Sequence, residues 1–153
     1  MKKMPKVITL LYKCARAAKD ALQRAKAEVE KSKGYVLYNE FNPAEVYHTP
    51  DLIGHAWIEI KKCNRFPQSA FVKWFKRLAR SRGKVERNYF HLTLNEVKFT
   101  LTKRNYGDGG YLLWVEVLPS NSMFITPREA VHRAAANVLR EYGMEAVMMS
   151  RLD

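Results

Sequence analysis

The segment His48–Lys62, "HTPDLIGHAWIEIKK", is the part of this sequence from which a fold and a function can be argued. It holds two acidic residues, Asp51 and Glu59, in a chain that is otherwise strongly basic. Strand-forming residues on both sides of Gly54 predict two short strands joined by a turn. In such a hairpin the two carboxylates could lie side by side.

The length of the turn decides which residues face each other. A three-residue turn over 54–56 pairs Asp51 with Glu59, whereas a two-residue turn pairs Asp51 with Ile58. Three-residue turns that contain glycine are common, so the first register is permitted. Lys61 shares a face with Glu59 in either case, because alternate side chains of a strand point the same way. With the three-residue turn, we expect Asp51 and Glu59 to lie close enough to share a cation.

Charge is distributed along the chain in blocks. The formal net charge is +12, and residues 1–33 hold ten Lys or Arg against three Asp or Glu. Residues 61–87 hold ten against one, while residues 34–60 hold no Lys or Arg and four acids. Two basic blocks therefore flank an acidic one. Clustering of this kind favours a polyanionic partner, nucleic acid first and an anionic membrane surface second.

Apolar periodicity predicts most of the remaining elements. Residues from about 6 to 31 carry apolar side chains at three- and four-residue intervals, which predicts a helix. Residues 64–83 predict a second helix, whose apolar stripe includes Phe71, Trp74 and Phe75. Further strands are expected at 35–41, 89–94, 97–103 and 111–118.

The last helix is predicted from the residues at its start. Thr126 and Glu129 form a capping box around Pro127 at the first helical position, and Gly143 ends the helix. The "GDGG" segment, 107–110, is expected to be a hairpin turn, since it lacks the following helix that a phosphate-binding loop requires. The predicted order is helix, three strands, helix, three strands, helix, which indicates an α+β protein.

The acidic segment resembles a known nuclease signature. P-D at 50–51 followed by E-I-K at 59–61 is similar to the P-D … E-x-K motif of the PD-(D/E)xK nuclease superfamily. The common core of that superfamily runs helix, three strands, helix, strand, and residues 6–94 have this predicted order. The segment that follows the motif, which contains Gln68, looks most like the phage and repair branch with VRR-NUC proteins and Holliday-junction resolvases. The resemblance implies a restriction-endonuclease-like core, extended by a C-terminal meander and helix.

The same resemblance implies a Mg²⁺-dependent (or Mn²⁺-dependent) endonuclease that cleaves DNA. Asp51 and Glu59 would be metal ligands, because hard carboxylate oxygens suit Mg²⁺. Lys61 would position the attacking water and offset the charge of the scissile phosphate. The family often adds a further acid, and Glu40 at the end of the first strand is the candidate for this third ligand. A homodimer is expected if the substrate is branched DNA.

The basic faces of the first two helices are the expected DNA-contacting surface. They lie opposite the apolar stripes, where Lys and Arg can neutralise phosphates. The residues expected to hold the DNA backbone are Arg16, Arg24, Lys73, Lys76, Arg77, Arg80, Arg82 and Lys84. A metal would explain the acidic block, because only at a metal does such a surface benefit from negative charge.

Two other functions fit the same residues. A motif this short also arises by chance, in which case Glu59 and Lys61 are the exposed side of an edge strand. The protein would then be a non-catalytic nucleic-acid-binding module, or a small accessory or inhibitor protein that docks on a larger nucleic-acid machine. His91-Leu92-Thr93 matches one half of the paired H-x-T signature of 2H phosphoesterases, but the second half is missing, so a polar sheet face is preferred.

Length, hydropathy and cysteine content narrow the class to which the protein can belong. One domain is expected for 153 residues. No apolar run reaches the roughly 20 residues that span a bilayer, and the basic N-terminus leads into a charged helix rather than a signal-peptide core. We therefore expect a cytoplasmic protein with no membrane partner. Cys14 and Cys63 are expected to be free thiols.

Overall fold

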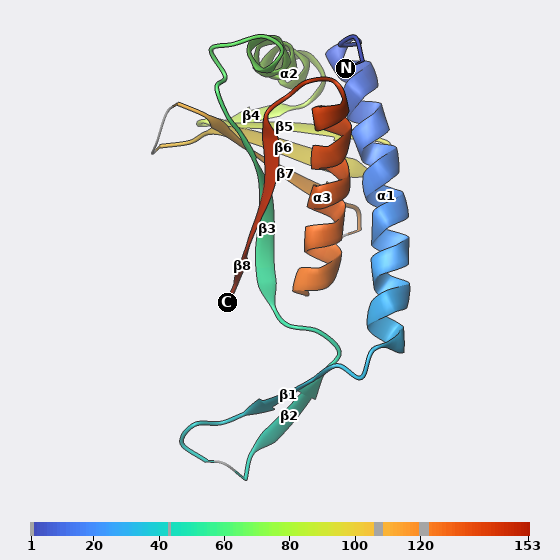
Figure 1. Ribbon diagram of the computed structural model, residues 1–153. Helices are drawn as coiled ribbons and strands as arrows, with labels where there is room; N and C mark the ends of the chain where they lie inside the picture. Colours follow the sequence, from blue (N-terminus) through green and yellow to red (C-terminus); the bar gives the residue numbers. More distant parts are fainter. Residues whose placement is uncertain (1, 43, 106–108, 120–122) are drawn as a thin grey trace.

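The computed structural model describes residues 2–42, 44–105, 109–119 and 123–153 (Figure 1). Part of the turn expected at 107–110 therefore lies outside the described residues. The chain has the mixed α+β content that was predicted. The elements are α1 (Val7–Lys31), β1 (Tyr35–Tyr38), β2 (Val46–Thr49), β3 (Gly54–Ile60), α2 (Gln68–Arg82), β4 (Lys84–Glu86), β5 (Tyr89–Leu94), β6 (Val97–Lys103), β7 (Tyr111–Val117), α3 (Ile125–Glu141) and β8 (Ala146–Leu152).

An antiparallel sheet forms the body of the molecule. Its strand order is β4-β5-β6-β7-β3-β8. The predicted meander is confirmed, since β5, β6 and β7 pair in sequence, with Asn95 and Glu96 at positive φ in the first turn, as a type I′ turn requires. β3 is inserted between β7 and β8, and β8 follows it from Gly54↔Leu152 to Ile60↔Ala146. β8 was not predicted, because its residues do not alternate between apolar and polar.

The helices of the described chain cover one face of this sheet. Residues 54, 56, 58 and 60 of β3 are buried, whereas the residues between them are more exposed, and β5 to β7 follow the same alternation. The buried side chains join those of the helices in one apolar cluster. Its fully buried large members include Leu10, Leu11, Ile58, Phe71, Phe75 and Phe99.

α3 lies between β3 and α1, and the two helices run side by side (Figure 1). Small residues line their contact: Ala15 and Ala135 are fully buried, and the Cys14 Sγ atom lies 3.8 Å from the carbonyl oxygen of Ala135. Burial raises the pKa of the Cys14 thiol to about 12, so the thiol stays protonated at neutral pH. Cys14 and Cys63 are thiols and form no disulfide with each other, as expected.

α2 packs over β4 and β5. Phe71 and Phe75 are fully buried, which confirms the core side of this helix. Trp74 was expected in the same stripe, but it is 47% exposed. The buried residues of α2 are Gln68, Phe71, Val72, Phe75 and Ala79. At about 100° per residue, Trp74 lies roughly 120° from the centre of that buried side, so its ring is left partly exposed.

β1 and β2 form a separate two-stranded sheet, which we call the arm (residues 35–49). Their pairing runs from Tyr35↔Thr49 to Tyr38↔Val46, and among the described residues neither strand joins the main sheet. The arm projects beyond the end of α1, away from the body (Figure 1). Because these strands would belong to the core of a restriction-endonuclease-like fold, that specific topology is not confirmed.

Candidate nucleic-acid interface

Asp51 caps the start of α3. It is 2% exposed, and its Oδ2 atom accepts a hydrogen bond from the backbone N–H of Thr126 at 2.8 Å. Its Oδ1 atom accepts from the Thr126 hydroxyl and from the Leu52 N–H, each at 2.9 Å. The first N–H groups of a helix have no partner within the helix, and the helix dipole favours negative charge beside them. The Asp51 carboxylate therefore has a structural role.

The capping box predicted within α3 is wrong. The helix begins at Ile125, so Thr126 is already inside it and gives its hydroxyl to Asp51. The Glu129 carboxylate accepts a hydrogen bond from the Ser150 hydroxyl at 2.6 Å, on β8. The Asp51 carboxylate, which is distant in sequence, takes the place of the predicted local cap.

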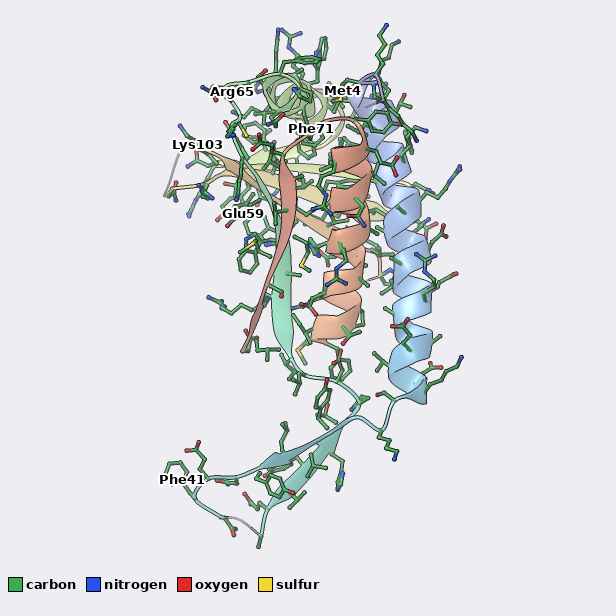
Figure 2. All side chains as sticks on the ribbon, viewed as in Figure 1. Met4, Phe41, Glu59, Arg65, Phe71 and Lys103 are labelled. Atoms are coloured by element: carbon green, nitrogen blue, oxygen red, sulfur yellow. The ribbon has the colours of Figure 1, made fainter. Side chains whose placement is uncertain are left out.

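Glu59 forms an ion pair with Arg104 on the face of the sheet that the helices leave uncovered (Figure 2). The Oε2 atom of Glu59 lies 3.3 Å from Nη1 of Arg104, and the two side chains are only 12% and 11% exposed. In the sheet, Glu59 sits between Leu112 of β7 and Val147 of β8. Such shielding strengthens the attraction, and it makes the loss of one partner costly.

Asp51 and Glu59 lie near opposite ends of β3. Asp51 precedes the strand, and Glu59 is roughly 16 Å along it from Gly54. β3 pairs with β7 and β8 instead of with residues 45–51, so the predicted pairing of Asp51 with Glu59 is wrong. Gly54 is not a turn residue: a Cβ atom there would lie 2.6 Å from the carbonyl oxygen of Arg151. The glycine permits the close approach of β8.

The other residues predicted for a nuclease site are also dispersed. Lys61 follows β3, and its carbonyl oxygen accepts a hydrogen bond from Gln68 at 3.0 Å. Glu40 lies between β1 and β2 on the arm, and Phe41, the next residue, is far from Glu59 (Figure 2). Within the described parts of the chain, no three His, Cys, Asp or Glu side chains are grouped so that they could hold a metal ion. The Mg²⁺-dependent nuclease therefore stays a prediction, without the geometry on which it depended.

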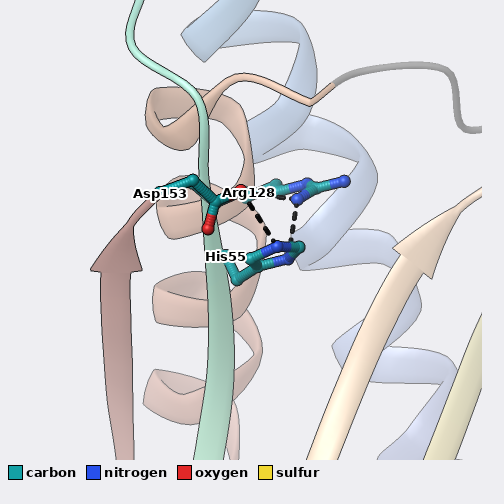
Figure 3. Close-up of polar contacts among 4 residues, drawn as sticks. His55, Arg128 and Asp153 are labelled. Carbon is teal, nitrogen blue, oxygen red and sulfur yellow. Dashed lines mark hydrogen bonds and ion pairs between the residues drawn. The ribbon is translucent and has the colours of Figure 1, made fainter.

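A polar cluster joins the start of β3 to α3 and to the chain after β8 (Figure 3). The Nδ1 atom of His55 lies 3.0 Å from Nη1 of Arg128, and its Nε2 atom lies 3.2 Å from Oδ2 of Asp153. Arg128 also donates to the carbonyl oxygen of Gly54 at 2.5 Å. Because a guanidinium only donates, Nδ1 of His55 is the acceptor, and the ring proton faces the carboxylate. These groups hold three segments together.

A pocket of about 480 Å³ opens beside this cluster, where β3 and β7 diverge beyond Ile58. His132 of α3 reaches into the gap, where its Nε2 atom accepts the backbone N–H of Val115 at 3.0 Å. Its Nδ1–H donates to the carbonyl oxygen of Arg128 at 2.7 Å. Burial lowers the pKa of His132 to about 4, so the ring is neutral at pH 7. The imidazole supplies a hydrogen bond that the sheet lacks at this point.

We expect His132 to make stability depend on pH. The unfolded chain takes up a proton near pH 6.5, whereas the folded chain does so only near pH 4. Between these values the unfolded state binds more protons, so stability falls as the pH drops. The contribution lost between about pH 7.5 and about pH 5.5 is about 1 kcal/mol. Urea unfolding of the wild type and of His132→Leu measures it: the variant should lack this part of the pH dependence, and equal dependence in both would contradict the assignment.

The solvent side of α2 is cationic along its whole length. The helix holds five Lys or Arg and no Asp or Glu. Four of them are exposed, and among the described residues none of the four is seen in an ion pair: Lys73, Arg77, Arg80 and Arg82. The Arg77 guanidinium lies 4.7 Å from the centre of the half-exposed Trp74 ring. This face combines unneutralised positive charge with an accessible aromatic ring.

Lys76 and Lys84, which were also predicted to contact DNA, interact with groups of the protein. The Lys76 ammonium donates to the Tyr111 hydroxyl at 2.7 Å and lies over the rings of Tyr111 and Phe90. Lys84 forms an ion pair with Glu86, and its hydrogen bond and charge lower the pKa of that carboxyl. Lys76 is only partly exposed and Lys84 is paired with an acid, so both are left out of the interface proposed below. The Arg80 guanidinium also lies 5.5 Å from the centre of the Phe90 ring, but Arg80 is exposed and is kept.

The positive charge of α1 is less concentrated. Arg16 and Arg24 are exposed, as predicted, but Asp20 lies one turn from each of them. On the uncovered face of the sheet, Tyr89 stacks on His91, whose Nδ1 atom lies 3.0 Å from the Thr100 hydroxyl. That face is polar around His91, as the sequence predicted, but it offers no row of cations comparable with α2 in the described part of the chain.

In comparisons with known proteins, no family model, no curated protein and no solved structure matches this chain. Among the described residues, none of the helices combines the length and the apolar content that a membrane-spanning segment needs.

Proposed function

We propose that the protein binds nucleic acid without cleaving it, through the exposed cationic face of α2. The observation that carries this proposal is a helix with four exposed Lys or Arg residues and no acid among its own. Lys and Arg side chains that are not neutralised by acids attract the phosphates of a nucleic acid, and binding releases the counterions of those phosphates. The two acids that a nuclease would need instead stabilise the fold.

The spacing of these cations suits a phosphate backbone. Lys73, Arg77 and Arg80 lie on the side of α2 opposite its buried residues, and they span about 10 Å along the helix axis. This length corresponds to about three phosphates of one strand, at 3.4 Å per nucleotide. Trp74, already stacked on Arg77, offers a ring on which an unpaired base can stack. Contacts of this kind position a protein without reading sequence, and DNA is the polyanion that we favour.

We expect Lys73→Gln/Arg77→Gln/Arg80→Gln to weaken DNA binding about 30-fold at moderate salt, because it removes three phosphate contacts. The plot of log affinity against log salt should become shallower by about 3. Fluorescence anisotropy with a labelled duplex of mixed sequence and with a single strand, each at several salt concentrations, measures both quantities. The wild type should not require Mg²⁺ for binding, and it should leave the DNA intact when Mg²⁺ is present.

A matched control removes the same charge elsewhere. Lys19 and Lys62 pair with Glu96 and Glu145, and Arg151 lies on β8, so Lys19→Gln/Lys62→Gln/Arg151→Gln should change the salt dependence far less. Equal losses in the two triple variants would mean that net charge alone drives binding. No DNA affinity in the wild type, or Mg²⁺-dependent cleavage, would overturn the proposal.

A further inference from the structure

The arm exposes an unusual amount of apolar surface. An isolated two-stranded hairpin is marginally stable in water, and apolar patches on both faces of one mark an interaction site. The cross-strand pairs Val36↔His48 and Leu37↔Tyr47 lie on opposite faces, so both faces carry apolar side chains. The exposed fractions are 47% for Tyr35, 44% for Val36, 45% for Leu37, 70% for Tyr38, 95% for Phe41, 41% for Val46 and 56% for Tyr47.

An apolar groove lies at the other end of the molecule. It has a volume of about 600 Å³ and lies between the start of α1 and α2. Phe66 on its edge is 73% exposed. Figure 2 shows Met4, which lines the groove, and Phe41, at the arm's end, at opposite ends of the structure. The lining residues are Met4, Pro5, Lys6, Val7, Ile8, Phe66, Ala70, Trp74 and Leu78.

The arm and the groove are complementary in charge. Residues 34–50 contain Glu40 and Glu45 and no Lys or Arg. The groove is built from two segments without acids, since residues 1–19 and 60–85 contain no Asp or Glu and fifteen Lys or Arg. An apolar, acidic arm therefore matches an apolar groove with a basic rim.

The arm cannot reach the groove of its own chain. α1 begins at the groove with Val7 and ends at Lys31, just before the arm, and it is about 37 Å long. Only another copy can present its groove to the arm. Tyr38 and Tyr47 belong to successive cross-strand pairs and so lie on opposite faces of the arm. Aromatic side chains bury about 150–250 Å² each, so Phe41 and one of these tyrosines, with the matching groove surface, bury about 600–1,000 Å², which approaches the size of a specific interface.

We propose that the arm of one copy docks in the groove of a second copy. Phe41 enters the apolar floor between α1 and α2, and Glu40 and Glu45 lie against the basic rim, which includes Lys6. The two surfaces differ, so each molecule offers one of each and can engage two neighbours or exchange arms with one. The proposal rests on the arm and the groove and does not require DNA binding. Trp74 lines the groove and also belongs to the surface proposed for nucleic acid, so association is measured without DNA.

Sedimentation velocity over a wide range of protein concentration tests this contact. The wild type should associate into dimers or larger species. Phe41→Asp places a charge on the arm, and Phe66→Asp places a charge at the edge of the groove. Each variant should be monomeric when it is alone. Both positions are largely exposed, so both variants should unfold at the wild-type urea concentration. Tyr89→Asp, at a 45% exposed aromatic outside both surfaces, should assemble like the wild type.

Mixing the two monomeric variants gives the sharpest result. Phe41→Asp keeps an intact groove and Phe66→Asp keeps an intact arm, so an equimolar mixture should form a one-to-one dimer and nothing larger. If arms paired with each other, Phe66→Asp would already assemble alone, and mixing it with Phe41→Asp would give no heterodimer. A monomeric wild type, association unaffected by Phe66→Asp, or no dimer in the mixture would each overturn the proposal.

Discussion

Replacing Asp51 by alanine should lower the free energy of unfolding by about 3 kcal/mol. The variant loses the carboxylate that accepts the Thr126 N–H, the Thr126 hydroxyl and the Leu52 N–H. The site is buried, so the donors are left without a partner, and the start of α3 loses a favourable negative charge. Urea unfolding followed by circular dichroism measures the change.

Asp51→Asn separates the two parts of this effect. The amide keeps one acceptor oxygen but removes the charge, so the loss should be smaller, about 1–2 kcal/mol. A residue that only binds a metal behaves differently, since its removal relieves a buried charge. Unchanged stability in Asp51→Ala would therefore show that the carboxylate does not support α3.

Glu59→Ala should also lower the free energy of unfolding by about 3 kcal/mol. It leaves the Arg104 guanidinium, 11% exposed, without the carboxylate 3.3 Å away. Breaking one side of a shielded pair is expensive because the remaining charge stays away from water. The same unfolding measurement applies. Glu96→Ala is the matched control, because Glu96 pairs with Lys19 but is 73% exposed, so its loss should cost well under about 1 kcal/mol.

The double variant Asp51→Ala/Glu59→Ala tests whether the two acids act together. They lie near opposite ends of β3, so their effects should add within about 0.5 kcal/mol. A shared metal site predicts the opposite: a clear coupling, and a wild type whose unfolding midpoint rises with Mg²⁺ while those of the variants do not. Coupling of this kind would favour the nuclease over the binding function proposed here.

The elements that were predicted correctly depend on local patterns. α1 and the β5-β6-β7 meander have periodicities of about 3.6 and 2, and each buries one side against its neighbours. The exposed face of α2 was predictable for the same reason, because its cations lie opposite Phe71 and Phe75. These features need only neighbours within a few residues.

The roles of the residues around the predicted nuclease site could not be predicted in this way. Gly54 reads as a turn but permits the close approach of β8. Thr126 and Glu129 read as a local cap, but Asp51, 75 residues from Thr126, supplies it. Glu59 reads as a metal ligand, but its partner is Arg104, 45 residues away. The sequence contains the residue types of the nuclease motif, but in the structure these residues contact other groups than the motif implies.

The sequence alone determined that this chain folds as an α+β protein with a cationic helix face, because charge content and apolar periodicity act over one or two turns of backbone. The tertiary structure decided what the acids do. A carboxylate next to a helix N-terminus or a shielded guanidinium stabilises the fold, whereas the same group beside a second carboxylate would bind a cation. Only the packing of β8 and α3 against β3 selects between these outcomes.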